Sequence, residues 1–220
     1  MPIAPVKACS ELPTTVRRTS IEAKRIMDVV LALFLIPLAL PILAAIAGIL
    51  LLQGRAVFYS QLRVGQDGRL FHLWKFRTMV PDADKSLENH LLHNPDAARE
   101  WHTNCKLRDD PRVTRFGAFL RKCSLDELPQ LWNVLLGQMS LVGPRPVTPT
   151  ELTQKYRTYA PAYLQCRPGM TGLWQVSGRN SLPYSKRVRL DAAYAAEQNL
   201  WLDLRILWRT VGVVLRGTGC

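Results

Sequence analysis

The chain has 220 residues, of which 48% are hydrophobic, and a formal net charge of +12. This charge favours anionic partners such as lipid headgroups, phosphorylated substrates or nucleic acid. The arginines are not interleaved with aromatic residues as in RNA-binding proteins, so we expect no nucleic-acid partner. The five cysteines are scattered without a C-x-x-C pair, which argues against a disulfide framework or a zinc site and indicates reduced thiols in the cytosol.

A long apolar run, Val29 to Leu52, follows a polar and basic lead-in of 21 residues. The run is long enough to cross a bilayer, which takes about 20 residues. Basic residues flank it on both sides, so the positive-inside rule gives no preferred orientation. Pro37 and Pro41 interrupt it, and because proline kinks a helix they predict a bent hairpin that re-enters the membrane over residues 22–54. A straight single span with a tolerated kink is the alternative.

Residues 55–220 are long enough for one small cytosolic domain, and their pattern predicts a mostly helical α+β fold. Two short apolar runs on either side of Asp67-Gly68, Ala56–Tyr59 and Leu70–Phe76, predict a β-hairpin. Apolar spacing and turn signals predict helices over 81–104, Val113–Lys122, Leu125–Leu136 and Tyr184–Glu197. In Leu200–Leu215, tryptophans and leucines recur every three or four residues with arginines between them. This pattern is typical of an amphipathic helix at the membrane interface, and a core helix is the alternative.

The candidate chemistry centres on Ser124, Asp126 and Glu127. Ser124 and Glu127 fit a helix capping box, which is a purely structural interpretation. A catalytic interpretation is compatible with it, because Asp126 would lie in the first helical turn, where the helix dipole favours a carboxylate and a bound phosphate. An ionised carboxylate beside a bound phosphate can attack phosphorus and form an acyl phosphate, while a neighbouring carboxylate holds a metal. Arg121 and Arg145 can supply planar forks for phosphate oxygens, or each is a solvated surface charge.

Five motifs occur in order along the chain: Lys24-Arg25-Ile-Met-Asp28, Trp74-Lys75-Phe-Arg-Thr-Met, Ser124-Leu-Asp126-Glu127-Leu-Pro-Gln-Leu-Trp-Asn133-Val, Ser140-Leu-Val-Gly-Pro-Arg145-Pro and Arg167-Pro-Gly-Met-Thr-Gly-Leu-Trp-Gln175-Val-Ser-Gly-Arg179-Asn180. Together they resemble a family of bacterial sugar transferases, the monotopic phosphoglycosyl transferases. The resemblance runs from about Lys24 to Leu215. It is closest to short members that start exopolysaccharide repeat units with galactose or glucose phosphate, and galactose is our first candidate for the sugar.

The resemblance implies transfer of a sugar 1-phosphate from a UDP-sugar to undecaprenyl phosphate, with release of UMP and a requirement for Mg²⁺. It also implies a bacterial inner-membrane protein whose catalytic domain lies on the cytosolic face. Asp126 is then expected to be the nucleophile and Glu127 its partner, and the two carboxylates are the expected metal ligands. Asp191 is a third expected catalytic residue, assisting the second proton transfer. The expected substrate-binding residues are Lys75, Arg121, Arg145, Gln175, Arg179 and Asn180.

One departure concerns the membrane segment. The re-entrant helix of the family often breaks at a Ser-Pro pair, whereas this chain has Leu40-Pro41 and so lacks the serine hydroxyl. Pro37 can supply the break instead.

Two other functions are compatible with parts of the sequence. Asp82-Ala83-Asp84 has the D-x-D pattern with which conventional glycosyltransferases bind a metal and release UDP, although neither a G-x-G-x-x-G motif nor a P-loop accompanies it. A membrane-tethered basic protein is the second alternative, and its binding would be sequence-blind and steeply salt-dependent. Such a protein would have no need of an Asp-Glu pair among arginines.

Overall fold

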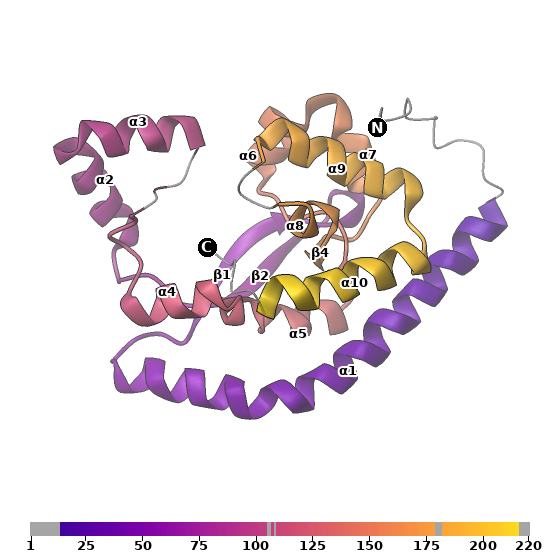
Figure 1. The fold of residues 1–220 in the computed structure, drawn as a ribbon, viewed down its shortest axis with the longest axis horizontal. Helices are drawn as coiled ribbons and strands as arrows, with labels where there is room; N and C mark the ends of the chain where they lie inside the picture. Colours follow the sequence, from indigo (N-terminus) through magenta and orange to yellow (C-terminus); the bar gives the residue numbers. More distant parts are fainter. Residues whose placement is uncertain (1–13, 105–106, 108, 179–181, 216–220) are drawn as a thin grey trace.

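The computed structural model describes residues 14–104, 107, 109–178 and 182–215. Its N-terminal helix α1, Thr14–Leu52, runs along the lower edge of the molecule, and most of the other elements lie on its inner side (Figure 1). Pro37 and Pro41 both lie inside this helix. The helix is continuous and bends, because a proline can kink a helix without ending it. The expected re-entry into the membrane stays a prediction.

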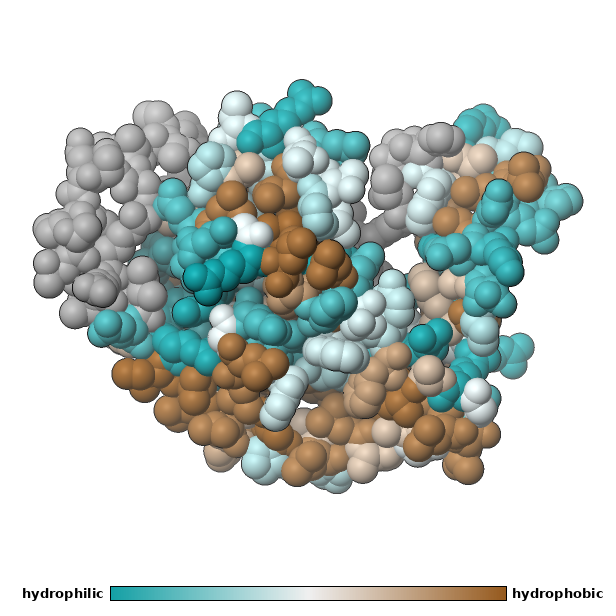
Figure 2. Space-filling model, turned by 180° about the vertical axis from the view of Figure 1, so that it is seen from behind, coloured by the Kyte–Doolittle hydropathy of each residue, from teal (hydrophilic) through white to brown (hydrophobic). Residues whose placement is uncertain are grey.

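One face of α1 packs against the rest of the protein. Its buried side chains, spaced four or seven residues apart, are Asp28, Ala32, Ala39, Ile46 and Leu50. These spacings bring residues to one side of a helix with 3.6 residues per turn. The other sides are apolar and exposed, and they form a hydrophobic band along the lower edge in Figure 2. Among the described residues, α1 is the one helix long and apolar enough to cross a membrane.

The predicted β-hairpin is confirmed, but its first strand starts two residues later than the predicted run Ala56–Tyr59 and extends five residues beyond it. Strands β1, Phe58–Val64, and β2, Leu70–Phe76, pair antiparallel, and all seven residues of each strand have a partner. At the tip, Asp67 and Gly68 have φ values of 56° and 79°, a conformation that glycine adopts freely and aspartate tolerates. The alternation along β2 puts Lys75 on the same face as the buried Phe71 and Leu73.

A second, smaller sheet was not predicted from the sequence. Strands β3, Ser140–Val142, and β4, Gly169–Thr171, are three residues long and pair in parallel. They hold the loop that begins at Gly143, because Gly143 N–H donates to Thr171 O at 2.9 Å.

Most of the remaining helices follow the predicted ranges. They are α2 (Ala83–His93), α3 (Pro95–Asn104), α4 (Arg115–Lys122), α5 (Gln130–Leu135), α6 (Pro149–Glu151), α7 (Ala160–Leu164), α8 (Leu173–Val176), α9 (Tyr184–Glu197) and α10 (Leu200–Leu215). Short 3₁₀ or π turns cover Gln66–Gly68, Leu125–Glu127, Leu152–Tyr156 and Arg157–Tyr159. The predictions for α9 and α10 are confirmed, and the predicted stretch 81–104 is a pair of helices that Figure 1 shows standing apart from the body.

The predictions for the segment 125–136 were wrong in two respects. A 3₁₀ turn, Leu125–Glu127, precedes α5, so no single helix spans the range. Pro129 explains the break, because a proline inside a helix clashes with the carbonyl four residues earlier. The capping box is absent as well, since Ser124 adopts a left-handed conformation (φ 57°) and its side chain makes no capping hydrogen bond.

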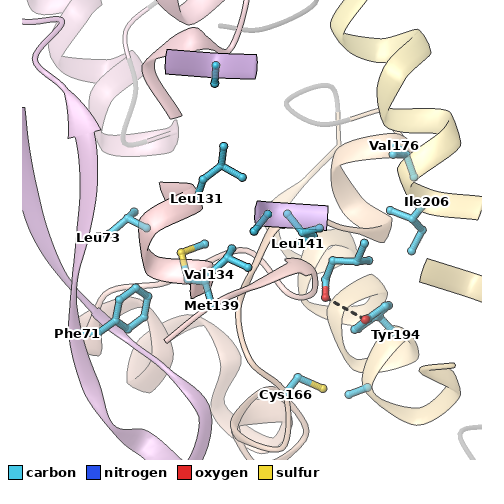
Figure 3. Close-up of a cluster of buried hydrophobic side chains, with 14 residues drawn as sticks. Phe71, Leu73, Leu131, Val134, Met139, Leu141, Cys166, Val176, Tyr194 and Ile206 are labelled. Atoms are coloured by element: carbon cyan, nitrogen blue, oxygen red, sulfur yellow. Dashed lines mark hydrogen bonds between the residues drawn. The ribbon is translucent and has the colours of Figure 1, made fainter. Parts of the chain in front are cut away.

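The main hydrophobic core lies where β2, α5, β3, α9 and α10 meet (Figure 3). Each element contributes a side chain that is at most 4% exposed, and these are Leu73, Val134, Leu141, Tyr194 and Ile206. Full burial of one such side chain stabilises a fold by about 1.5–3 kcal/mol. The core therefore fixes the short elements that carry the polar groups described next.

Candidate active site

A buried asparagine of α5 joins this helix to strand β2. Asn133 is 0% exposed, and its side-chain amide donates to His72 O at 2.8 Å while its carbonyl oxygen accepts from Trp74 N–H at 3.2 Å. Both partners belong to β2, next to Lys75. A side chain of α5 thus completes the hydrogen bonding of the strand and fixes the distance between Lys75 and the Asp126–Glu127 turn.

The expected catalytic pair lies in this turn. The left-handed conformation of Ser124 turns the chain so that Asp126 is buried, at 6% exposure, and Glu127 is partly exposed. Lys75 Nζ lies 2.6 Å from Glu127 Oε1 and 3.7 Å from Asp126 Oδ2. Arg145 Nη1 lies 3.9 Å from the same oxygen of Glu127. The structure therefore brings together four of the residues that the sequence analysis selected.

Burial raises the pKa of Asp126 above its ordinary value. The positive charges of Lys75, Arg121 and Arg145 oppose this rise, whereas the negative charge of Glu127 adds to it. A buried carboxylate has lost solvating water, and here cations replace part of that water. The arrangement suits a carboxylate that must stay ionised yet react with an anionic phosphate.

A small pocket lies directly beside this cluster. Its volume is about 20 Å³, roughly enough for one water molecule, and basic and acidic side chains line it, among them Arg63, Lys75, Glu127 and Arg145. Arg63 was not selected from the sequence. Lys75, which lines the pocket, also bridges the two carboxylates.

Arg145 extends from a loop whose backbone is held at several points. Gly169 N–H donates to Pro144 O at 2.8 Å, and Arg63 Nη1 donates to Pro146 O at 3.3 Å. A Cβ atom added to Gly169 would lie 2.0 Å from Gly143 N, so this close approach requires glycine. The loop is thus fixed on both sides of Arg145.

A capping box is present three residues after Arg145, at the start of α6, although none was predicted there. Thr148 Oγ1 accepts from Glu151 N–H, and the Glu151 carboxylate accepts from Thr148 N–H, at the start of α6. Glu151 Oε2 also forms an ion pair with Arg63 Nη1 at 3.0 Å. The pattern Thr148-Pro-x-Glu151 could have been found in the sequence, because proline favours the first position of a helix.

Arg121 extends from α4 toward Asp126 and Glu127, the two carboxylates that we call the dyad. Its Nε donates to Thr78 Oγ1 at 2.9 Å, and its charge is among those that lower the pKa of Asp126. Arg145 in turn lies over the ring of Trp174, 5.6 Å from the centroid. Three cations, the third being Lys75, thus surround one buried carboxylate.

Asp191 lies on α9 in a buried cluster next to the Arg145 loop. It is 1% exposed, accepts a 2.6 Å hydrogen bond from Tyr156 OH, and lies 3.8 Å from Arg187 Nε. Burial raises the pKa of Asp191 to about 6, although the charge of Arg187 and the Tyr156 hydrogen bond lower it. The charge and the backbone N–H of Arg145 also lower this pKa. Arg187 and Arg145 both stack on Trp174, which connects this cluster to the dyad. The expected proton transfer by Asp191 stays a prediction.

The remaining expected residues lie on or after α8. Gln175 is buried, and neither polar atom of its amide has a hydrogen-bond partner in the part of the chain that the structure describes. Arg179 and Asn180 lie outside the described residues. The residues of the D-x-D pattern, Asp82 and Asp84, are exposed at the start of α2.

The dyad fits magnesium only if a phosphate ligand shares the ion. Among the described residues there is no group of three or more His, Cys, Asp or Glu side chains able to hold a metal. Magnesium commonly takes one or two carboxylates and completes its shell with water and substrate phosphate. The ammonium of Lys75 lies between Asp126 and Glu127, which shows that this position favours positive charge.

A family model and several individual proteins match this sequence. Residues 19–217 match the model of a family described as "Bacterial sugar transferase". The chain is 50% identical over 196 residues to a UDP-galactose-lipid carrier transferase of Erwinia amylovora, covering 89% of this chain and 41% of that protein. It is 45% identical over 203 residues to an undecaprenyl-phosphate galactose phosphotransferase of Salmonella typhimurium, covering 92% of this chain and 42% of that protein.

A shorter relative matches over most of its own length. The exopolysaccharide production protein ExoY of Rhizobium meliloti is 46% identical over 198 residues, which cover 90% of this chain and 87% of that protein. The chain therefore spans about two fifths of the two longer relatives and nearly all of the shorter one.

Proposed function

Because the chain belongs to the bacterial sugar transferase family, we propose that it transfers a hexose 1-phosphate from a UDP-sugar to undecaprenyl phosphate. The transfer would be the first membrane step in the assembly of an exopolysaccharide or a related glycan. The names of the relatives, which include undecaprenyl-phosphate galactose phosphotransferase and exopolysaccharide production protein, support this substrate class. The observation that carries the proposal is the buried carboxylate of Asp126 surrounded by Lys75, Arg121 and Arg145.

In the first step, a carboxylate oxygen of Asp126 attacks the phosphorus nearest the sugar. A bond forms between this oxygen and phosphorus, and the bond to the UMP oxygen breaks, so UMP leaves with the electron pair. Lys75 and Arg145 lie where they can stabilise the negative charge that develops on the phosphate oxygens. The product is an acyl phosphate in which Asp126 carries the sugar phosphate.

In the second step, a phosphate oxygen of undecaprenyl phosphate attacks the same phosphorus. The bond to Asp126 breaks and its carboxylate is regenerated, so the two steps make a ping-pong cycle. The held backbone of the Arg145 loop supports this role, because a fixed guanidinium loses little freedom when it binds phosphate oxygens in a bidentate way.

Asp126 and Glu127 would hold the magnesium that we expect the reaction to need, and the bound ion would neutralise phosphate charge. Lys75 must then leave its position between the two carboxylates. It is free to move toward a phosphate oxygen, since its ammonium is a flexible point charge with no rigid fork.

We also propose that α1 re-enters the membrane from the cytosolic face. The exposed apolar sides of the bent helix support this topology. Trp201 and Trp208 of α10 are 83% and 81% exposed, and two tryptophans at this spacing suit the headgroup level. UDP-sugars and magnesium are cytosolic, and the acceptor phosphate lies at the membrane surface, so the dyad would have access to both substrates.

Incubation of the purified protein with magnesium, undecaprenyl phosphate and a panel of UDP-sugars tests the activity. The proposal predicts release of UMP with at least one sugar and formation of a lipid-linked sugar diphosphate. Release of UDP would contradict it and indicate a conventional glycosyltransferase. Release of neither UMP nor UDP would favour the remaining alternative, a membrane-tethered basic protein that binds anionic partners without catalysis.

A further inference from the structure

One helical turn near the start of α1 is bonded to both segments that carry the catalytic groups. Lys24 Nζ donates to Val142 O at 2.9 Å and forms an ion pair with Asp203 Oδ2 at 2.6 Å. Asp28 Oδ1 accepts from Leu141 N–H at 3.0 Å. Arg25 reaches a different element, α5, with both of its terminal nitrogens.

Arg25 caps the C-terminal end of α5. Its Nη1 donates to Val134 O at 2.6 Å and its Nη2 to Leu135 O at 2.8 Å. The last carbonyls of a helix lack partners within the helix, so a guanidinium is well placed there. α5 begins three residues after Glu127 and carries Asn133, which bonds to β2 beside Lys75. Arg25 therefore fixes the short helix that sets the geometry of the dyad.

Lys24 and Asp28 hold the other catalytic segment. Their partners, Val142 O and Leu141 N–H, belong to β3, which leads directly into the loop of Arg145. Tyr194 OH reinforces the same point, since it lies 2.7 Å from Asp203 Oδ1 and 3.1 Å from Val142 O. The dashed line in Figure 3 marks the bond from Tyr194 to β3.

Neither membrane orientation nor folding stability alone explains why Lys24, Arg25 and Asp28 have these fixed partners. Basic residues that only set orientation beside a membrane segment need no fixed partners. Asp28 and Asp203 are 0% exposed, and Asp28 Oδ2 has no hydrogen-bond partner among the described residues, which is unfavourable for folding. Buried ion pairs contribute little net stability, yet they impose a defined geometry.

We propose that Lys24, Arg25 and Asp28 are positioning residues for catalysis. Through their contacts, the packing of α1 against the domain fixes the Asp126–Glu127 turn and the Arg145 loop. The catalytic groups therefore reach their reactive arrangement only when the Lys24–Asp28 segment of α1 is packed against the domain. The inference rests on the proposed function, since it concerns the rate of that reaction.

The first test compares two charge-preserving variants of the full chain in lipid nanodiscs. Arg25→Lys keeps the charge beside the membrane segment but loses the two-pronged contact with α5. It should lower kcat for UMP release about tenfold, while KM for the UDP-sugar changes less than threefold and flotation with membranes is unchanged. Arg55→Lys is the matched control at the other end of α1, because the side chain of Arg55 has no hydrogen-bond partner among the described residues. It should change none of the three quantities.

A full kcat in Arg25→Lys would overturn the inference, and so would a loss of membrane flotation, since the role would then be topological. Wild-type protein that releases no UMP would contradict the proposed function instead, which keeps the two failures distinct.

A second variant decides the matter if Arg25→Lys fails to fold. Asp28→Leu removes the acceptor for Leu141 N–H together with a buried carboxylate oxygen that has no partner. It should lower kcat at least fivefold with little or no loss of thermal stability in detergent, whereas Asp28→Asn keeps the acceptor and should retain most of the rate. An unchanged kcat in Asp28→Leu would overturn the inference.

Discussion

Replacement of Lys75 by methionine should move the pH dependence of the reaction in a direction that the structure determines. The proposed nucleophile Asp126 must be ionised to react, and burial raises its pKa while the charge of Lys75 lowers it. Methionine has a similar shape but no charge, so the pKa of Asp126 should rise further in the variant. The acid limb of the pH–rate profile should therefore shift to higher pH.

The size of the shift follows from the distance between Lys75 Nζ and Asp126 Oδ2, which is 3.7 Å. Two unit charges at this distance interact by about 4.5 kcal/mol at an effective dielectric constant of about 20, and by about 1.1 kcal/mol in bulk water. The Lys75 side chain is 24% exposed, so the effective value lies between these limits. At about 1.36 kcal/mol per pH unit, these limits correspond to about 0.8 and about 3.3 units, and we expect the acid limb to shift by an amount between them.

The assay is kcat/KM for UMP release between pH 5 and 9, because kcat/KM reports ionisations of the free enzyme. The magnesium concentration is fixed at a low value that leaves most of the free enzyme without metal, so that Lys75 keeps its position beside Asp126. Lys85→Met removes an exposed charge on α2 and should leave the acid limb in place. The plateau rate of Lys75→Met should also fall, since Lys75 is a proposed phosphate ligand. An acid limb that stays in place or moves to lower pH would refute this account of how Asp126 is kept ionised.

Three further predictions concern the phosphate site, the small sheet and the membrane topology. Arg145→Lys keeps the charge but loses the bidentate fork, and it should cost about 1–3 kcal/mol of transition-state stabilisation, measured as kcat/KM; an unchanged value would return Arg145 to a surface charge. Gly169→Ala puts a Cβ atom 2.0 Å from backbone and should destabilise the protein by about 1–3 kcal/mol or more in thermal unfolding, whereas Gly48→Ala meets nothing within 4 Å and should be neutral or slightly stabilising. Single cysteines at positions 18 and 55, in a cysteine-free background, should both resist an impermeant thiol reagent in intact cells and react after lysis; labelling of position 18 in intact cells would show a full span.

Local sequence patterns predicted the elements that depend on local physics. The range Tyr184–Glu197 is predicted correctly because its apolar residues recur at helical spacing, and the hairpin follows from two apolar runs around Asp67-Gly68. Asp126 and Glu127 stood out in the sequence as candidate site residues, but the predicted capped helix start is a 3₁₀ turn in the structure. Pro129 is in the sequence and predicts a break there, so this error could have been avoided.

Other features depend on contacts between distant parts of the chain. The three-residue strands β3 and β4 are too short to have a periodic pattern. The ion pair between Lys24 and Asp203 joins residues 179 positions apart, and no local signal connects them. The hydrogen bond between Asp191 and Tyr156 likewise follows only from the packing of α9 on the domain.

The most direct test of the central claim is mass spectrometry of the protein after incubation with magnesium and the preferred UDP-sugar, without undecaprenyl phosphate. A covalent mechanism predicts about one equivalent of UMP released per active enzyme. It also predicts a hexose-phosphate adduct on the peptide that contains Asp126, which disappears when undecaprenyl phosphate is added. Asp126→Asn should fold normally and give neither UMP nor adduct. UMP release that strictly requires the acceptor, with no adduct on Asp126, would contradict the proposed mechanism.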